Sequence, residues 1–166
     1  MAFLAGNKKI SFEMKIILRR LTLKDYIGVR EVDEQTQRQY LGQKWDRLSK
    51  DKRESHLKSR SSEFETSANT GFSFVAIHDG KIVGFIFAYE TLSFHGRLHI
   101  HHIAIHPQYQ NQGIGMQLYK RLVKKAKQKD IKKIIALINL DNPASIRLHE
   151  KLGFTLKDRK EATLDL

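Results

Sequence analysis

Apolar and polar positions follow two different periods along this chain, and the changes of period mark its expected elements. Residues 14–22 (MKIILRRLT) are rich in branched apolar side chains, which predicts a first strand. From Lys24 to about Phe64 the apolar positions recur every three or four residues. This spacing predicts two helices with a break near Gly42.

The clearest strand signal is the segment GFSFVAIHDGKIVGFIFAYETL. Its β-branched and aromatic residues flank Asp79 and Gly80, a pair that readily adopts the positive φ angles of a tight turn. We therefore predict a β-hairpin here. A further β-rich run covers Arg97–Ile105 and is stopped by Pro107.

The remaining third of the chain alternates helix, strand and helix. A helix is predicted from about Gly113 to Lys129, because its apolar residues form one stripe. The apolar run at 132–140 is typical of a buried strand. Asn142 then caps a helix that ends at Gly153, and the tail beyond it allows one or two closing strands.

Length and composition indicate one basic domain. The chain has 166 residues, with 30 Lys and Arg against 18 Asp and Glu, which gives a formal charge of +12. We expect residues 1–13 to be an N-terminal extension, because Met14 is a plausible start, and residues 14–166 to form a single domain. The absence of Cys excludes disulfides and thiolate chemistry. No apolar run approaches the length of about 18 residues that a membrane span needs, and no signal peptide is evident, so we expect a soluble, cytoplasmic protein.

The charge does not by itself select a partner. A nucleic acid would fit it, but the Lys and Arg are scattered and no zinc-finger or RRM signature is present. The same positive electrostatic field would also attract an anionic small molecule.

Candidate chemistry lies in the loop between the Arg97–Ile105 strand and the next helix. There Gln110, Gly113 and Gly115 follow the pattern Gln-x-x-Gly-x-Gly. A helix start offers unpaired N–H groups and the positive end of the helix dipole, and glycines let a diphosphate approach them. The dinucleotide fingerprint and the P-loop both fail on these residues, because Leu118 stands where a third Gly is needed and no Lys-Ser/Thr pair follows Gly115. A close helix–strand turn would explain the glycines equally well.

Three segments in the right order make the chain resemble the GNAT superfamily of acetyl-CoA-dependent N-acetyltransferases over nearly all of 14–166. They are the Asp79-Gly80 hairpin, the segment IAIHPQYQNQGIG, and the segment NPASIRLHEKLGF. The resemblance implies a mixed α/β fold. Its central mixed sheet would have about six to seven strands, including an antiparallel hairpin and a splayed parallel pair, flanked by about four helices.

The same resemblance implies how acetyl-CoA is bound. The loop backbone would wrap the diphosphate, and unpaired groups on the splayed strand would bind the pantetheine arm and polarise the thioester carbonyl. The implied cofactor-binding residues are Ile103, Ala104, Ile105, Gln110, Asn111, Gln112, Gly113, Ile114, Gly115, Met116, Asn142 and Ser145.

Amine acetylation needs a neutral amine, so a base is expected at the site. In LHIHHIAI, strand alternation places His99 and His101 on one face and His102 on the other unless a bulge intervenes. We predict His99 and His101 as the base pair, as in the arylalkylamine-like branch of the family. Half-buried structural histidines, or a His-x-His zinc site without an evident third ligand, are the alternatives; the family needs no metal.

Proton donation to the leaving thiolate is the other expected step. His149 stands where much of the family has a Tyr, and it would donate as imidazolium unless CoA leaves unaided. The form LHEKLGF with this His is similar to the branch that acetylates phosphinothricin-like amino acids.

The predicted function is direct acetyl transfer to a primary amine of a small molecule, an amino acid, a protein or a peptide. Acetyl-CoA and the amine acceptor are the expected partners, a homodimer is compatible with the family, and neither a membrane nor a nucleic acid is the favoured partner. Two other classes stay open: a non-catalytic CoA-binding regulator and a basic nucleic-acid-associated protein.

Overall fold

The computed structural model describes residues 14–91, 95–159, 162 and 164. The proposed extension at 1–13 lies outside the described residues, and the division at Met14 stays a prediction. The elements, in chain order, are β1 (Ile17–Arg20), η1 (Leu23–Asp25), α1 (Tyr26–Leu41), α2 (Gln43–Arg47), α3 (Lys50–His56), α4 (Ser61–Asn69), β2 (Phe74–His78), β3 (Lys81–Glu90), β4 (Arg97–Ile105), η2 (Pro107–Tyr109), α5 (Ile114–Gln128), β5 (Lys133–Ala136) and α6 (Pro143–Lys151).

One mixed sheet in the order β1-β2-β3-β4-β5 forms the centre of the molecule. All neighbouring strands are antiparallel except β4 and β5, which are parallel. The mixed α/β prediction is confirmed. The sheet of the described residues has five strands, however, fewer than the six to seven expected.

The absence of a closing strand from residues 154–159 has a packing explanation. The ring of Phe154 packs against His149 at 4.9 Å and against Tyr119 at 6.0 Å between ring centroids. This packing draws the start of the tail toward the helices instead of along the edge of the sheet.

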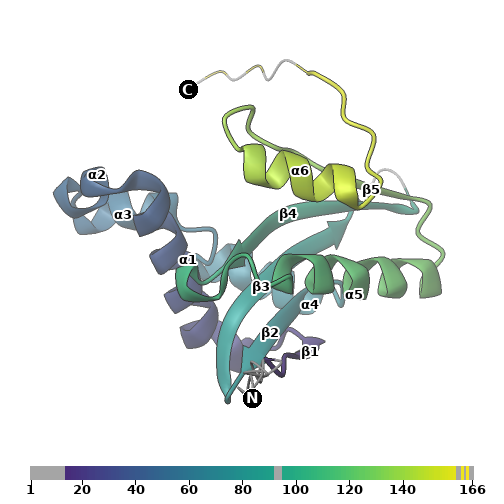
Figure 1. Cartoon of the computed structure of the whole chain (residues 1–166), viewed down its shortest axis with the longest axis horizontal. Helices are drawn as coiled ribbons and strands as arrows, with labels where there is room; N and C mark the ends of the chain where they lie inside the picture. The colour runs from purple at the N-terminus through teal and green to yellow at the C-terminus, as the bar shows by residue number, and fades with distance from the viewer. Residues whose placement is uncertain (1–13, 92–94, 160–161, 163, 165–166) are drawn as a thin grey trace, which may run out of the picture.

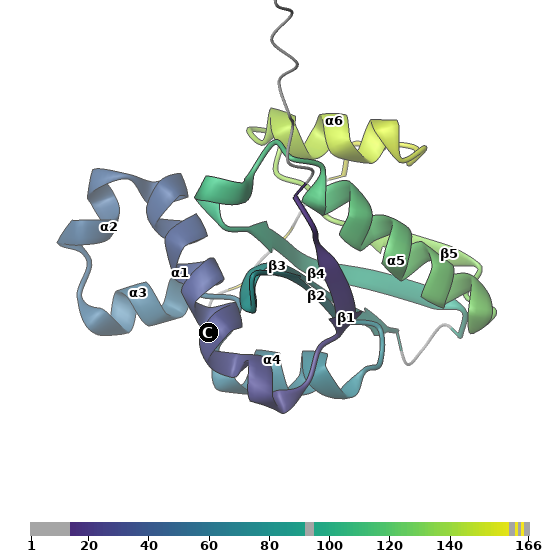
Figure 2. The ribbon, with the colours of Figure 1, turned by 60° about the horizontal axis from the view of Figure 1, so that its bottom comes forward.

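Helices cover both faces of the sheet (Figures 1 and 2). On one face α5 packs over β1–β4, with Leu118, Tyr119 and Leu122 fully buried, and α6 lies beside α5. On the other face α1 and α4 pack on a second core that includes Phe64 and Phe85. The short helices α2 and α3 project to the side of α1 in Figure 2.

Local signals placed the turns correctly. Asp79 and Gly80 have φ angles of 46° and 76°, and they join β2 to β3 as predicted. Gly42 ends α1 with a φ of 55°. The polar region after it forms three short helices and not one, because the chain turns at Leu48 and Leu57, both of which have extended backbone.

Candidate active site

The start of α5 presents a cluster of unused backbone donors. Gly113 caps the helix in a left-handed conformation with a φ of 78°, and no side chain caps the helix. Asn111 also has a positive φ, of 61°. The first intrahelical bond runs from the Gln117 N–H to the Gly113 carbonyl, at 3.1 Å. Among the described residues, the backbone N–H groups of 111–116 donate to no acceptor. Such a cluster at a helix N-terminus favours an anion.

Gln110 anchors this loop instead of contributing a free donor. Its side-chain amide donates to the Ile105 carbonyl at 3.0 Å and to Gln39 Oε1 at 2.8 Å, and Gln39 donates back at 3.2 Å. Its own backbone N–H points to the Pro107 carbonyl at 3.4 Å. Gln110 thus ties the loop to α1 and to the end of β4.

The two glycines of the loop have different functions. At Gly115 a Cβ atom would lie 3.5 Å from Leu148 Cδ2 and 3.9 Å from Ile103 Cδ1, so this glycine faces α6 and β4. At Gly113 a Cβ atom would meet nothing within 4 Å. Gly113 is therefore required by its positive φ and leaves the surface over the donors open.

Strands β4 and β5 separate beyond their first residues. Their parallel pairing covers Arg97–Ile100 and ends at the Ile100–Ala136 pair. Strand β4 nevertheless continues to Ile105 along β3, where Ile105 lies opposite Gly84. Strand β5 ends at Ala136, and the next residue, Leu137, is 77% exposed. The edge of β4 toward β5 is therefore unpaired over 101–105, which spans about 13 Å. Of the three residues predicted from the resemblance, Ile103 and Ile105 direct their backbone groups to this edge, whereas those of Ala104 face β3, since the bond from the His106 N–H to the Val83 carbonyl fixes the alternation.

A β-bulge at His101 changes the expected alternation of the histidines. Phe87 lies opposite His102 and Ala88 lies opposite Ile100, so His101 is the extra residue. The Tyr89 ring lies 5.8 Å from His99 and 6.3 Å from His101. Because of the bulge, His99, His101 and His102 all lie on the face covered by α1 and α4, whereas simple alternation placed His102 on the opposite face.

His102 forms a buried pair with a residue that the sequence did not single out. Asp33 on α1 is fully buried, and its Oδ2 accepts the N–H groups of Lys58 and Ser59, both at 2.7 Å. Its Oδ1 lies 3.9 Å from His102 Nε2, and neither atom has a hydrogen-bond partner among the described residues. Burial lowers the pKa of His102 to about 4, which the charge of Asp33 only partly opposes. The one signal for Asp33 in the sequence is its position four residues after Val29, on the buried stripe of α1.

His101 is half-buried and lies near charged side chains of both signs. Burial lowers its pKa, and the positive charges of Lys58 and Arg60 act in the same direction, while Glu63 opposes them. A neutral ring is therefore favoured at neutral pH, and a neutral imidazole can accept a proton.

His149 is enclosed, and both of its ring nitrogens are engaged. Nδ1 lies 2.7 Å from the Ser145 carbonyl and must donate to it, so in the neutral ring Nε2 accepts the Tyr119 hydroxyl at 2.5 Å. Burial raises the pKa of Tyr119. Asn142 accepts the Ser145 N–H at 3.0 Å and thereby caps α6. The proton-donor assignment for His149 stays a prediction, and it requires the contact with Tyr119 to break.

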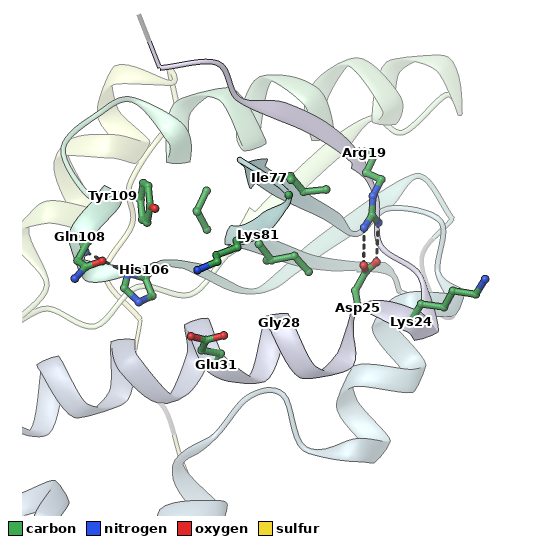
Figure 3. A pocket seen from close by; sticks show the side chains of 13 residues that line it. Arg19, Lys24, Asp25, Gly28, Glu31, Ile77, Lys81, His106, Gln108 and Tyr109 are labelled. Carbon is green, nitrogen blue, oxygen red and sulfur yellow. Dashed lines mark hydrogen bonds and ion pairs between the residues drawn. The ribbon is translucent and has the colours of Figure 1, made fainter. Parts of the chain in front are cut away.

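A separate cavity of about 440 Å³ lies between α1, the β2–β3 turn and the segment 106–109 (Figure 3). Arg19 and Asp25 already pair there, at 2.6 and 2.7 Å. Lys81 and Glu31 add opposite charges to its lining. No buried polar atom among the lining residues lacks a partner, so we assign no function to this cavity.

The described residues contain neither a candidate metal site nor a candidate membrane-spanning helix. Within 14–91 and 95–159 no group of three or more His, Asp or Glu side chains is arranged to hold a metal ion. In the same part of the chain, no helix has both the length and the apolar character that crossing a bilayer requires.

Comparison with known proteins identifies the family and the fold. Residues 31–154, well over half of the chain, match the family described as the acetyltransferase (GNAT) family. This chain belongs to the GNAT family. A solved structure of the PaiA N-acetyltransferase from Thermoplasma acidophilum, in complex with coenzyme A, has a TM-score of 0.75 and 19% identity. It covers 89% of this chain and 94% of that one, which shows the shared GNAT fold.

Curated relatives of this GNAT protein match in part of their length. An L-methionine sulfoximine/L-methionine sulfone acetyltransferase of Salmonella typhimurium is 34% identical over 84 residues, 49% of each chain. The L-amino acid N-acyltransferase MnaT of Escherichia coli is 31% identical over 96 residues, 56% of each chain. The matches thus span about half the length of these relatives.

Proposed function

We propose that this protein is an N-acetyltransferase that moves the acetyl group of acetyl-CoA to the primary amine of a small amino acid. One observation carries the proposal. The unpaired edge of β4 begins at His101 and ends at Ile105, and the loop with its free N–H groups begins five residues later, at Gln110. A diphosphate held at the loop directs the attached acyl arm along this edge.

The binding functions follow from this arrangement. The N–H groups of 111–116 hold the diphosphate, since they have no other acceptor. Backbone groups of Ile103 and Ile105 on the open side of β4 bond the amides of the arm, except for the Ile105 carbonyl, which Gln110 already occupies. The unpaired edge is about 13 Å long and closes at Ile100. The thioester therefore lies at the level of His101 and His102.

The chemical step joins the amine nitrogen to the thioester carbon and breaks the C–S bond. The attacking amine must first lose a proton, and after attack the nitrogen gives up another, while the sulfur leaves as a thiolate that takes up a proton. His99 and His101 lie on the face of β4 that the acceptor would approach, and we propose them as the groups that take the amine proton.

The acceptor class rests on the relatives. Both curated relatives are named for acetyl or acyl transfer to amino acids. Lys58 stands close enough to His101 to lower its pKa, and its ammonium group suits an α-carboxylate, whereas Arg60 is already paired with Glu63.

The test is thiol release from acetyl-CoA with a panel of L-amino acids, L-methionine sulfoximine, polyamines and N-terminal peptides. We expect turnover with one or more amino acids. CoA binding by calorimetry without thiol release from any amine would favour a regulator. Absence of CoA binding, together with salt-sensitive binding of duplex DNA, would favour a nucleic-acid-associated protein.

The proposed base has its own test. We expect His99→Ala to lower kcat more at pH 7 than at pH 9.5, because a larger fraction of the acceptor amine is already neutral at the higher pH. An equal loss at both pH values would contradict a function of His99 in proton removal.

A further inference from the structure

Asp33 is a buried carboxylate whose two oxygens have different surroundings. Its side chain lies on α1 and has no exposed surface. Oδ2 accepts the backbone N–H groups of Lys58 and Ser59, both at 2.7 Å, and so holds the segment between α3 and α4. Oδ1 accepts no hydrogen bond within the described residues and lies 3.9 Å from His102 Nε2 on β4. The fold therefore uses one oxygen of this carboxylate and leaves the other beside the histidine.

Holding the segment between α3 and α4 does not require a negative charge. The carbonyl oxygen of an Asn side chain could accept the same two N–H groups. Burying a charged carboxylate also costs more free energy than burying a neutral amide. The carboxylate at Asp33 therefore points to a function for Oδ1, and His102 is the group that this oxygen faces.

The ring of His102 connects this buried carboxylate with the accessible side of β4. Nε2 is buried, but the side chain as a whole keeps 20% of its exposure. Nδ1 makes no hydrogen bond within the described residues and is not enclosed as Nε2 is, so a ligand can reach it. His102 also lies beyond Ile100, where the pairing of β4 with β5 ends. Nδ1 is thus the nitrogen of this ring that an acceptor amine can contact.

The carboxylate decides which ring nitrogen of His102 carries the proton. The pKa of about 4 keeps the ring neutral at pH 7, and a neutral imidazole has one N–H group and one nitrogen lone pair. A proton on Nε2 directs the N–H dipole at the negative oxygen of Asp33, whereas a proton on Nδ1 directs a lone pair at it. The low dielectric of a buried site increases the difference between these two arrangements. Nε2 is therefore protonated, and Nδ1 is left to accept a hydrogen bond.

We propose that Asp33 is a positioning residue for acetyl transfer and acts through His102, an inference that rests on the proposed function. Asp33 keeps the proton of His102 on Nε2, and Nδ1 accepts a hydrogen bond from an N–H of the neutral acceptor amine. This bond fixes the direction of the nitrogen lone pair that attacks the thioester carbon. No proton is transferred to His102, so its function is separate from proton removal by His99 and His101.

The Asp33→Asn variant reverses the tautomer while it keeps the buried contacts. Its side-chain oxygen can still accept the N–H groups of Lys58 and Ser59, and its NH2 group then faces His102 Nε2. Because this NH2 group donates and does not accept, it favours the proton on Nδ1. Histidine-selective 15N NMR reads the tautomer directly, with the signals of His102 assigned from their loss in His102→Gln. We expect the Nε2–H tautomer in the wild type and the Nδ1–H tautomer in Asp33→Asn.

Steady-state kinetics measure whether the tautomer affects transfer. In Asp33→Asn an N–H of His102 opposes an N–H of the amine, so kcat/KM for the most active L-amino acid of the thiol-release panel should fall about tenfold to a hundredfold. The KM for acetyl-CoA should stay unchanged, because the N–H groups of the loop are not altered. Asp46→Asn is the matched control: it removes the same charge from an exposed pair with Arg38, and it should leave activity unchanged. In the His102→Gln background, Asp33→Asn should have little further effect on kcat/KM.

The outcomes separate this inference from the proposed function. A wild-type His102 with its proton on Nδ1 would overturn the positioning function, whether or not Asp33→Asn folds and whatever the activity. Reversal of the tautomer without loss of activity would also overturn it, as would an equal loss of activity from Asp33→Asn in the wild type and in His102→Gln. Asp33 would then serve only to hold the segment between α3 and α4. Absence of transfer from the wild type to every amine of the panel would instead overturn the proposed function.

Discussion

The contact between Tyr119 and His149 provides a quantitative test of how the α5–α6 interface is held. Tyr119 is fully buried and His149 is 2% exposed. The Tyr119→Phe change keeps the ring that packs against Phe154 but removes the hydroxyl that donates to His149 Nε2 at 2.5 Å. Because Nδ1 is held by the Ser145 carbonyl, the ring cannot turn to find another partner. The variant then buries an unpaired nitrogen, which should lower the free energy of unfolding by about 1–3 kcal/mol.

The pH dependence of this loss follows from the tyrosine itself. Burial raises the pKa of Tyr119 in the folded state above its unfolded value of about 10. Stability from the neutral phenol is therefore complete below pH 10, and it is lost above pH 10 as the unfolded chain releases the proton. The advantage of the wild type over Tyr119→Phe should shrink by about 1.4 kcal/mol per pH unit above pH 10.

Urea unfolding at pH 8 and pH 11 measures both effects. The fluorescence of Trp45, the single tryptophan and a fully buried one, reports the transition. The comparison between wild type and variant cancels the titration of the lysines, which both proteins share. A variant within about 0.5 kcal/mol of the wild type at pH 8, or a difference that stays constant up to pH 11, would refute this account of the pair.

Three further predictions concern the sheet, the loop and the buried histidine. Gly84→Ala would place a Cβ atom 2.6 Å from Ile105 Cδ1, so we expect a loss of about 1–3 kcal/mol in chemical denaturation, and Ile105→Val, which removes that atom, should recover part of it. Gly113→Ala and Gly80→Ala impose the same strain, at φ angles of 78° and 76°, and each should cost about 1–2 kcal/mol of stability. Only Gly113→Ala should weaken acetyl-CoA binding, by about tenfold in calorimetry, because relaxation of its strain turns the N–H groups of the loop. His102 has a folded pKa of about 4, below its unfolded value of about 6.5, so the stability it contributes is full above pH 6.5 and falls toward pH 4. The His102→Gln variant should lose less stability over that interval in acid titrations followed by circular dichroism, and parallel curves would count against the buried neutral ring.

Local sequence was sufficient for the elements and turns that depend on neighbouring residues. The Asp79-Gly80 turn, the β4 span of Arg97–Ile105 and the glycine-capped start of α5 all follow from signals within a few positions. The reason is that turn angles, strand preference and helix capping are properties of short stretches of chain. The loop at 110–116 was recognisable for the same reason, since its glycines and the helix after it are adjacent in the sequence.

Tertiary structure alone decided where the side chains of the site lie. The bulge at His101 exists only in the pairing of β4 with β3, and it turns His102 onto the face of His99. Asp33 meets His102, and Tyr119 meets His149, across distances in sequence that no periodicity spans. The end of β4–β5 pairing at Ile100 likewise depends on how separate elements pack. Burial and pairing between distant segments are set by the packed sheet and helices as a whole, and the pattern within any one segment does not contain them.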